Sequence, residues 1–179
     1  MKCLLSDSNG KNTLVYAVRR PGWKLCREEA LDINALFAAN GPLNEDTTQL
    51  IGIVKETAPT KQCMDDKCLG VGEFINKYFP RGTVYRDDNL LFYEALGNRS
   101  LLRNGFFGSF NPISIYREGK KLGKRLEEKG VDGNLKGEGV KLGGVLIFNS
   151  RGDVVYTHPE VTGKQFPVAE IADVINSIV

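Results

Sequence analysis

Apolar residues along the chain fall into short runs whose spacing alternates between that of strands and that of helices. Residues 13–18, Thr-Leu-Val-Tyr-Ala-Val, are rich in β-forming side chains and are followed by Pro21 and Gly22, so they predict a buried strand that ends in a turn. A helix is predicted from about residue 24 to residue 40, where Gly41 and Pro42 end it. The apolar face of this helix has spacings of four, three and four residues and consists of Cys26, Ala30, Ile33 and Phe37.

The middle of the chain repeats this alternation. Residues 50–54 predict a second strand, and residues 83–86 predict a third, shorter one. Asp88 is predicted to cap a helix that runs through Leu96. Between the second and third strands, a helix is predicted whose single apolar face carries Val71, Phe74, Ile75 and Tyr78.

The C-terminal part predicts a hairpin and a closing helix. Two apolar runs, 144–148 and 154–157, flank the turn sequence Ser-Arg-Gly-Asp at 150–153. Proline is favoured at the first position of a helix, so Pro167 predicts the start of the last one. Its core-facing residues are Val168, Ile171, Ile175 and Ile178.

The resulting order, β-α-β-α-β-α-loop-β-β-α, predicts an α/β protein with a mixed central sheet flanked by helices on both faces. The thioredoxin-like fold has this order. Residues 98–142 then form an irregular insertion before the C-terminal hairpin, with a short basic helix at about 120–129. No internal repeat is visible, and residues 1–179 are interpreted as a single domain.

Composition and charge exclude several function classes. The chain is 41% hydrophobic and 26% charged, which is typical of a globular domain, and its net charge of +2 gives no strong attraction to nucleic acid or a membrane surface. No run approaches the roughly 18 apolar residues of a membrane span. The first ten residues are too polar for a signal peptide, which favours a cytoplasmic protein. The alternative is a targeting segment that was removed before this numbering begins, which would place the protein elsewhere.

The chain contains four irregularly spaced cysteines, which indicate reduced thiols in a reducing compartment rather than a disulfide framework. His158 is the single histidine, and a structural role is favoured for it over that of a general base. The sequence therefore predicts neither a metal site nor a cofactor.

Cys26 is the principal candidate for a reactive group. It lies in the first turn of a helix that follows the carboxyl end of a central strand, where the helix N-terminus favours a thiolate. The alternative is that Cys26 is an inert apolar residue packed under the helix. The cationic residues near Cys26 in sequence favour the reactive thiol; they are Arg19, Arg20, Lys24 and Arg27. The predicted pKa of Cys26 is therefore well below the roughly 8.5 of a free thiol.

Three separated segments resemble the peroxiredoxin-like 2 family, in the same order along the chain. They are residues 17–30 (Ala-Val-Arg-Arg-Pro-Gly-Trp-Lys-Leu-Cys-Arg-Glu-Glu-Ala), residues 134–145 and the hairpin that ends at His158. The Arg-Arg-Pro-Gly and Cys-Arg-Glu-Glu-Ala blocks look most similar to the 2A branch. The resemblance implies a thioredoxin-like fold, a cytosolic setting and a thiol-based antioxidant or redox-regulatory activity. A related branch of the family is a prostamide/prostaglandin F synthase that reduces an endoperoxide.

The chain departs from the family motif Cys-x-x-Cys, because Trp23 stands at the position of the first cysteine. A local dithiol cannot form there. Cys26 matches the second cysteine, the helix position that peroxiredoxins give to their peroxide-reactive sulfur, so a one-cysteine peroxidase stays open. Trp23 either covers this thiol or marks a site that has lost its chemistry.

Four further residues are secondary candidates. Cys63 and Cys68 are either a redox pair that resolves Cys26 or two unrelated thiols, and the neighbouring aspartates favour the second interpretation. Thioredoxins place a cis-proline near the thiol, just before the strand that corresponds to residues 144–148. This chain has Gly143 and Gly144 there instead. Two glycines would let the backbone approach the thiol closely.

Two functions from different classes compete. The first is a thiol peroxidase or reductase in which Cys26 attacks a peroxide or other small-molecule substrate, Arg19 or Arg20 stabilises the thiolate, and an external thiol donates electrons. A prostaglandin F synthase-like reductase is a variant of it. The second is a catalytically degenerate binding or scaffold module that meets a protein partner through Trp23 and an aromatic cluster, Phe106, Phe107 and Phe110.

Overall fold

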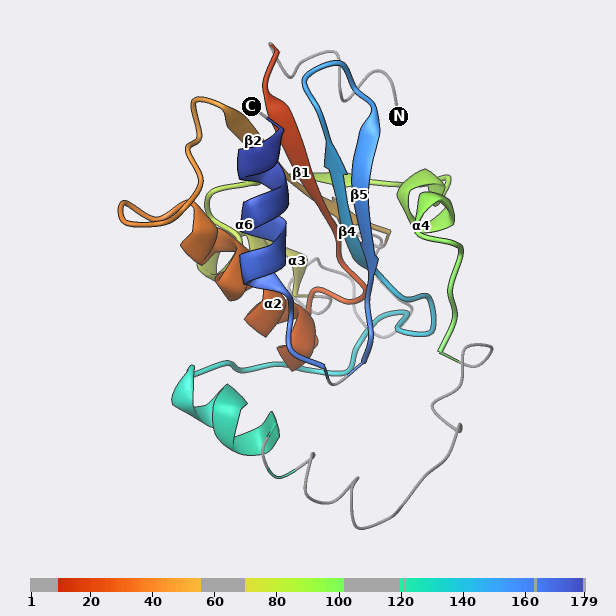
Figure 1. The fold of residues 1–179 in the computed structure, drawn as a ribbon. Coiled ribbons are helices and arrows are strands. Elements are labelled where there is room, and N and C mark those ends of the chain that lie inside the picture. Colours follow the sequence, from red (N-terminus) through yellow and green to blue (C-terminus); the bar gives the residue numbers. More distant parts are fainter. Residues whose placement is uncertain (1–9, 56–69, 102–119, 121, 163, 179) are drawn as a thin grey trace.

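A computed structural model describes residues 10–55, 70–101, 120, 122–162 and 164–178. Five strands form one mixed sheet in the order β3-β2-β1-β4-β5 (Figure 1). The first three strands run parallel, and the hairpin of the last two strands joins the sheet at β1, with β4 antiparallel to β1. The strands are β1 (Asn12–Ala17), β2 (Thr48–Val54), β3 (Thr83–Arg86), β4 (Gly144–Phe148) and β5 (Val154–Pro159).

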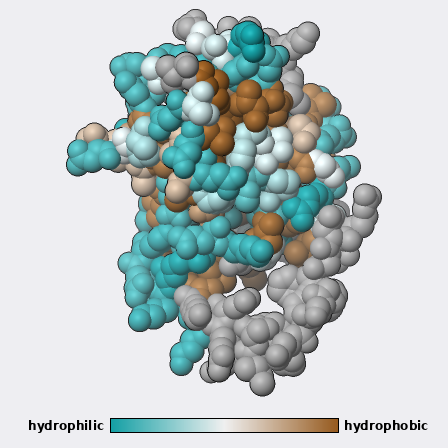
Figure 2. Space-filling view, viewed as in Figure 1, coloured by the Kyte–Doolittle hydropathy of each residue, from teal (hydrophilic) through white to brown (hydrophobic). Residues whose placement is uncertain are grey.

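Helices cover both faces of this sheet, as the alternating pattern predicts. They are α2 (Lys24–Leu36), α3 (Val71–Glu73), the π-helix η2 (Phe74–Tyr78), α4 (Leu91–Ala95) and α6 (Val168–Ser177). Helices α2 and α6 lie on one face of the sheet, and α4 lies at the other (Figure 1). The surface on the α2 side is largely hydrophilic, with apolar patches in its upper part (Figure 2). None of the described helices is long and apolar enough to cross a membrane.

The two faces of β1 supply the centres of two hydrophobic clusters. Leu14 and Tyr16 point toward α2 and α6, whereas Val15 and Ala17 point toward α4. This division follows from the period of two along a strand. Every residue of β1 is buried, because β1 is the central strand and is covered on both faces.

Two predicted boundaries are wrong, for local reasons. Helix α2 ends at Leu36 rather than near residue 40, because the chain turns back and the Leu43 N–H donates to the Leu36 carbonyl at 2.9 Å. The side-chain acceptor at the start of α4 is Asp87, whose Oδ2 accepts from the Phe92 N–H at 2.9 Å. Asp88 instead pairs with Arg86 at 2.6 Å.

Two further helices differ from the prediction, one in its type and one in its first residue. The helix expected around Val71 to Tyr78 continues as a π-helix. In it, the Phe79 N–H donates to the Phe74 carbonyl oxygen, five residues earlier. Pro167 is the N-cap of α6 rather than its first helical residue. The short basic helix is present at 120 and 122–128.

Candidate functional site

Cys26 lies in the first turn of α2, just beyond the carboxyl end of the central strand β1. Trp23 is the N-cap residue, and its side chain makes no capping hydrogen bond. Cys26 is 1% exposed and belongs to the hydrophobic cluster that also holds Tyr16 and Ala30. The predicted location is therefore confirmed, together with the burial that the alternative interpretation expected.

The environment of this thiol raises its pKa. Burial has the largest effect, and the carboxyl groups of Glu29 and Glu160 raise the pKa of Cys26 further. A hydrogen bond from the Arg20 backbone and the charge of Arg19 lower the pKa, but they do not offset burial. The prediction of a pKa below that of a free thiol is thus wrong for this conformation, because desolvation outweighs the helix terminus and the cations.

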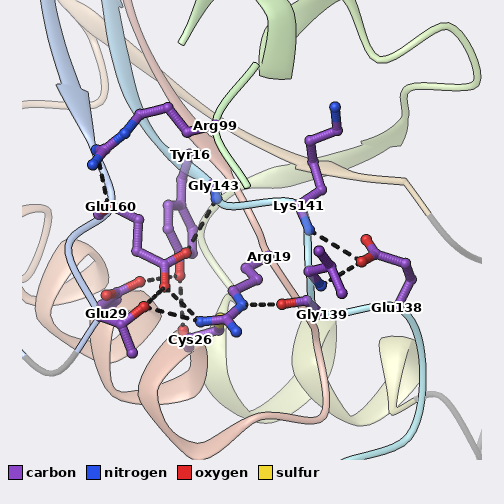
Figure 3. A network of polar contacts seen from close by, with 12 residues as sticks. Tyr16, Arg19, Cys26, Glu29, Arg99, Glu138, Gly139, Lys141, Gly143 and Glu160 are labelled. Atoms are coloured by element: carbon purple, nitrogen blue, oxygen red, sulfur yellow. Dashed lines mark hydrogen bonds and ion pairs between the residues drawn. The ribbon is translucent and has the colours of Figure 1, made fainter. Parts of the chain in front are cut away.

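Arg19 is the centre of a buried polar network beside Cys26 (Figure 3). Its Nη1 donates to Glu160 Oε1 and to the Thr162 hydroxyl, both at 3.1 Å, and its Nε donates to the Gly139 carbonyl at 2.5 Å. The guanidinium also lies over the Trp23 ring, 4.2 Å from its centroid. Arg19 therefore joins the end of β1 to two segments that are more than a hundred residues away in sequence.

Gly143 and Gly144 bring the start of β4 against the end of β1. A Cβ at Gly143 would overlap the Ala17 carbonyl oxygen and lie 3.0 Å from the Arg19 nitrogen. Gly144 has a φ of +148°, which favours glycine. The Gly143 N–H donates to Glu160 Oε2 at 3.1 Å, so the close approach that the sequence predicts also fixes the carboxylate that pairs with Arg19.

Tyr16 connects Cys26 to a second carboxyl group. Its hydroxyl lies 2.7 Å from Glu29 Oε2 and 3.1 Å from the Cys26 carbonyl oxygen (Figure 3). Burial raises the pKa of Glu29 to about 8, and the negative charge of Glu160 adds to this. Burial also raises the pKa of Tyr16, which keeps its hydroxyl neutral and able to donate.

The other predicted cations do not converge on the thiol. Arg20 is half-buried and donates from Nη1 to the Leu135 carbonyl at 3.0 Å, and Lys24 is exposed. Arg27 is fully buried, but its guanidinium is held by the Pro21 carbonyl at 3.0 Å and by Glu73 at 2.6 Å. Arg19 is the side chain whose charge favours the Cys26 thiolate.

Glu29 also lines a small cavity of about 60 Å³. His158, Glu160 and Phe166 line the same cavity, and the His158 ring meets the Phe166 ring edge-on at 6.0 Å. Burial lowers the pKa of His158, so its imidazole is neutral near pH 7.

Several predicted residues lie outside the described part of the chain. They are Cys3, Cys63, Cys68 and the aromatic cluster of Phe106, Phe107 and Phe110. Within the described ranges, no three His, Cys, Asp or Glu side chains are grouped as metal ligands would be.

Comparison with known proteins identifies the family. The family model described as AhpC/TSA antioxidant enzyme matches residues 41–162, more than half of the chain. The chain belongs to the AhpC/TSA antioxidant enzyme family. The matched region includes Gly143 and Glu160 but begins after α2, so Cys26 and Arg19 lie before it.

Individual relatives confirm the resemblance to the peroxiredoxin-like 2 proteins. The chain is 31% identical to peroxiredoxin-like 2A of Gallus gallus, in an alignment that covers 82% of this chain and 56% of the relative. It is 27% identical to the prostamide/prostaglandin F synthase of Sus scrofa, in an alignment that covers 81% of this chain and 63% of that protein. The chain thus spans less than two thirds of the length of these relatives.

Solved structures confirm the thioredoxin-like fold. Mycobacterium tuberculosis AhpC matches with a TM-score of 0.53 and 12% identity, over 96% of this chain and 72% of that one. A thioredoxin-like protein from Aeropyrum pernix matches with a TM-score of 0.50 and 15% identity, over 97% and 81% of the two chains. At such identities the likeness concerns the fold alone. Family membership supports a redox-related function for the chain.

Sequence reasoning missed the two carboxyl groups of this site, Glu29 and Glu160, and the tyrosine that contacts Glu29. Glu29 lies three residues after Cys26, so helical spacing alone places it on the same side of α2. Glu160 follows β5, and its ion pair with Arg19 spans 141 residues, for which no local signal exists. Tyr16 lies in the strand that the sequence predicts, and a buried tyrosine hydroxyl requires a hydrogen-bond partner, so that requirement is the signal for this contact.

The raised pKa of Glu29 predicts a pH-dependent difference in stability between the wild type and Glu29→Gln. The folded protein holds the Glu29 proton up to about pH 8, whereas the unfolded chain releases it near the ordinary glutamate pKa of 4.5. Stability that is fully present below pH 4.5 is therefore lost as the pH rises toward 8. Glutamine does not titrate, so the Glu29→Gln protein does not lose this stability. The free energy of unfolding of Glu29→Gln minus that of the wild type should therefore increase between about pH 5 and about pH 8, by at least about 1 kcal/mol. Urea unfolding at both pH values measures it, and a constant difference would contradict the shift.

Proposed function

We propose that this chain is a thiol-dependent redox protein of peroxiredoxin-like type, with Cys26 as its reactive thiol and Arg19 as the group that stabilises the thiolate. One observation carries the proposal: within a family of antioxidant enzymes, Cys26 occupies the first turn of the helix after the central strand, where the Arg19 charge favours its thiolate. Arg20 contributes through its backbone hydrogen bond to the thiol. Trp23 covers the Arg19 guanidinium rather than supplying a second thiol.

The reaction requires a peroxide or other small-molecule substrate and a thiol that donates electrons. The Cys26 thiolate attacks the terminal oxygen of a hydroperoxide and the O–O bond breaks, so Cys26 becomes a sulfenic acid while the other oxygen takes up a proton and leaves as an alcohol or water. Two equivalents of external thiol then return it to the thiol, with release of water and a disulfide. A thiol that is 1% exposed reacts only when the first turn of α2 moves, so turnover should be slow. A reducing compartment such as the cytoplasm suits this cycle.

We expect the wild type to consume alkyl hydroperoxide slowly in the presence of dithiothreitol, and Cys26→Ser to fall to the background rate. Peroxide consumption, followed by a colorimetric assay, measures both. Cys63→Ser and Cys68→Ser are the matched controls and should keep most of the activity, because the aspartates next to these cysteines disfavour their thiolates. Equal loss in either control would make that cysteine the resolving thiol. A Cys26→Ser variant as active as wild type would overturn the proposal.

The burial of Cys26 and its raised pKa favour a second candidate, a binding or scaffold module of the same fold that has lost its chemistry. Alkylation of the folded protein by iodoacetamide distinguishes the two. Labelling of Cys26 whose rate rises with pH supports the redox protein. Absence of both labelling and peroxide consumption would support the module, which would act through a protein partner.

Relatives named prostamide/prostaglandin F synthase favour one variant of the first candidate. In this variant the Cys26 thiolate would attack one oxygen of a cyclic endoperoxide instead of a hydroperoxide, and the other oxygen would leave as an alkoxide that takes up a proton. Two equivalents of external thiol would then release the first oxygen from the sulfur as a hydroxyl group, restore the Cys26 thiol and form a disulfide. A lipid endoperoxide offered in the same assay tests it, and a faster rate than with alkyl hydroperoxide would assign that substrate class.

A further inference from the structure

Glu29 is linked to the Cys26 turn through the Tyr16 hydroxyl, and it also lines a cavity. It lies three residues after Cys26, and the Tyr16 hydroxyl lies within hydrogen-bond distance of its Oε2 at 2.7 Å and of the Cys26 carbonyl at 3.1 Å. On its other side, Glu29 lines the cavity of about 60 Å³ with His158 and Glu160. The carboxyl group thus belongs to the same helix as Cys26, three residues further on, and lines a space that is large enough for a water molecule or a small polar group.

The groups around Glu29 keep it protonated at neutral pH. Burial and the charge of Glu160, which faces it from the segment after β5, raise its pKa to about 8, and Glu28 of the same helix adds to this. The Tyr16 hydrogen bond and the Arg19 charge lower the pKa, but they do not cancel the rise. Lys164 also lines the cavity but is exposed. At pH 7 the site therefore holds a neutral carboxylic acid, which can donate a proton.

Neighbouring groups are less suited to that role. Glu160 is committed to Arg19 and to the Gly143 N–H, at 3.1 Å each. His158 lines the same cavity, but its lowered pKa leaves it without a second proton near pH 7. Tyr16 holds its proton too tightly to release it, because burial raises its pKa well above the ordinary value.

We propose that Glu29 is the acid that protonates the departing oxygen when Cys26 reduces a peroxide, an assignment that rests on the proposed function. The thiolate sulfur forms a bond to the terminal oxygen of R–O–O–H, the O–O bond breaks, and the electron pair stays on the R–O oxygen. The Glu29 carboxyl gives its proton to this oxygen, so the products are the Cys26 sulfenic acid, an alcohol and the Glu29 carboxylate. Solvent returns a proton to Glu29 before the next turnover.

The test compares leaving groups of different basicity in the full chain. With tert-butyl hydroperoxide, whose alkoxide leaving group needs a proton, Glu29→Gln should lose about 10²-fold in the rate of Cys26 oxidation at pH 7. With peracetic acid, whose acetate leaving group needs none, the rate should stay within about threefold of wild type, because glutamine still accepts the Tyr16 hydrogen bond. Asp32→Asn on the same helix is the matched control for loss of a carboxylate, and it should leave both rates unchanged.

A third readout separates proton donation from a structural role. Alkylation of Cys26 by iodoacetamide needs a thiolate but no acid, so it should not slow in Glu29→Gln. Equal losses with both peroxides, parallel loss of alkylation, or no loss at all would each overturn the Glu29 assignment while leaving Cys26 as the reactive thiol. A wild-type protein that consumes neither peroxide would instead overturn the proposed function, and the assignment with it.

Discussion

Replacement of Arg19 by methionine should destabilise the protein by about 3–5 kcal/mol, measured by urea unfolding followed by circular dichroism. The Arg19 and Glu160 side chains are 6% and 4% exposed and lie 3.1 Å apart. Without Arg19, the Glu160 carboxylate stays buried with the Gly143 N–H as its remaining strong donor, and the Gly139 carbonyl loses the Arg19 Nε. Leaving the Glu160 charge buried without a partner destabilises the folded state far more than the loss of its attraction to Arg19 does.

Two variants check this reason. Arg81→Met is the matched control, because it breaks an ion pair of 2.8 Å with Glu45 whose side chains are 41% and 57% exposed. Its effect should be about 0–1 kcal/mol, since solvent screens exposed pairs. The double variant Arg19→Met with Glu160→Gln removes the unpaired charge, so it should recover part of the stability. A double variant as unstable as the sum of the two single variants would contradict the ion-pair explanation.

The sheet and the helices could be predicted because their signals are local. Residues 13–18 alternate between two buried faces, and the spacing of Cys26, Ala30 and Ile33 gives one face of α2, both of which the structure confirms. The end of α2 could not be predicted, because it depends on the Leu43 N–H, seven residues away, reaching the Leu36 carbonyl. The choice of Asp87 over Asp88 likewise depends on the direction in which each side chain leaves the turn.

The position of the candidate site could be predicted, but its electrostatics could not. Cys26, Arg19, Gly143 and Gly144 were all found from sequence, because strand ends, helix starts and glycine pairs are readable patterns. The sign of the Cys26 pKa shift was wrong, because burial and distant carboxyl groups decide it. Arg27 is close to Cys26 in sequence, but its guanidinium binds the Pro21 carbonyl and Glu73 instead of the thiol.

These observations connect the stability of the site to its chemistry. This conformation disfavours the Cys26 thiolate. It also keeps the Glu29 carboxyl protonated and holds the Arg19 charge near the thiol. A conformation in which water reaches Cys26 would remove the desolvation that raises the pKa of its thiol. On the proposed function, opening of the first turn of α2, rather than a resting thiolate, would control the rate of peroxide reduction.

Gly143→Ala should destabilise the fold by more than about 4 kcal/mol, the range in which a single substitution has a specific steric cause. The new Cβ would overlap the Ala17 carbonyl oxygen and lie 3.1 Å from the Ala17 carbonyl carbon, and neither backbone atom can move without separating β1 from β4. The same shift would carry the Gly143 N–H away from Glu160. Gly123→Ala is the matched control: no atom lies within 4 Å of its Cβ, and in the short helix at 122–128 alanine should stabilise by about 0.5–1 kcal/mol. Thermal and urea unfolding of the two variants measure the contrast, and a Gly143→Ala protein within about 1 kcal/mol of wild type would show that β1 and β4 do not need this close approach.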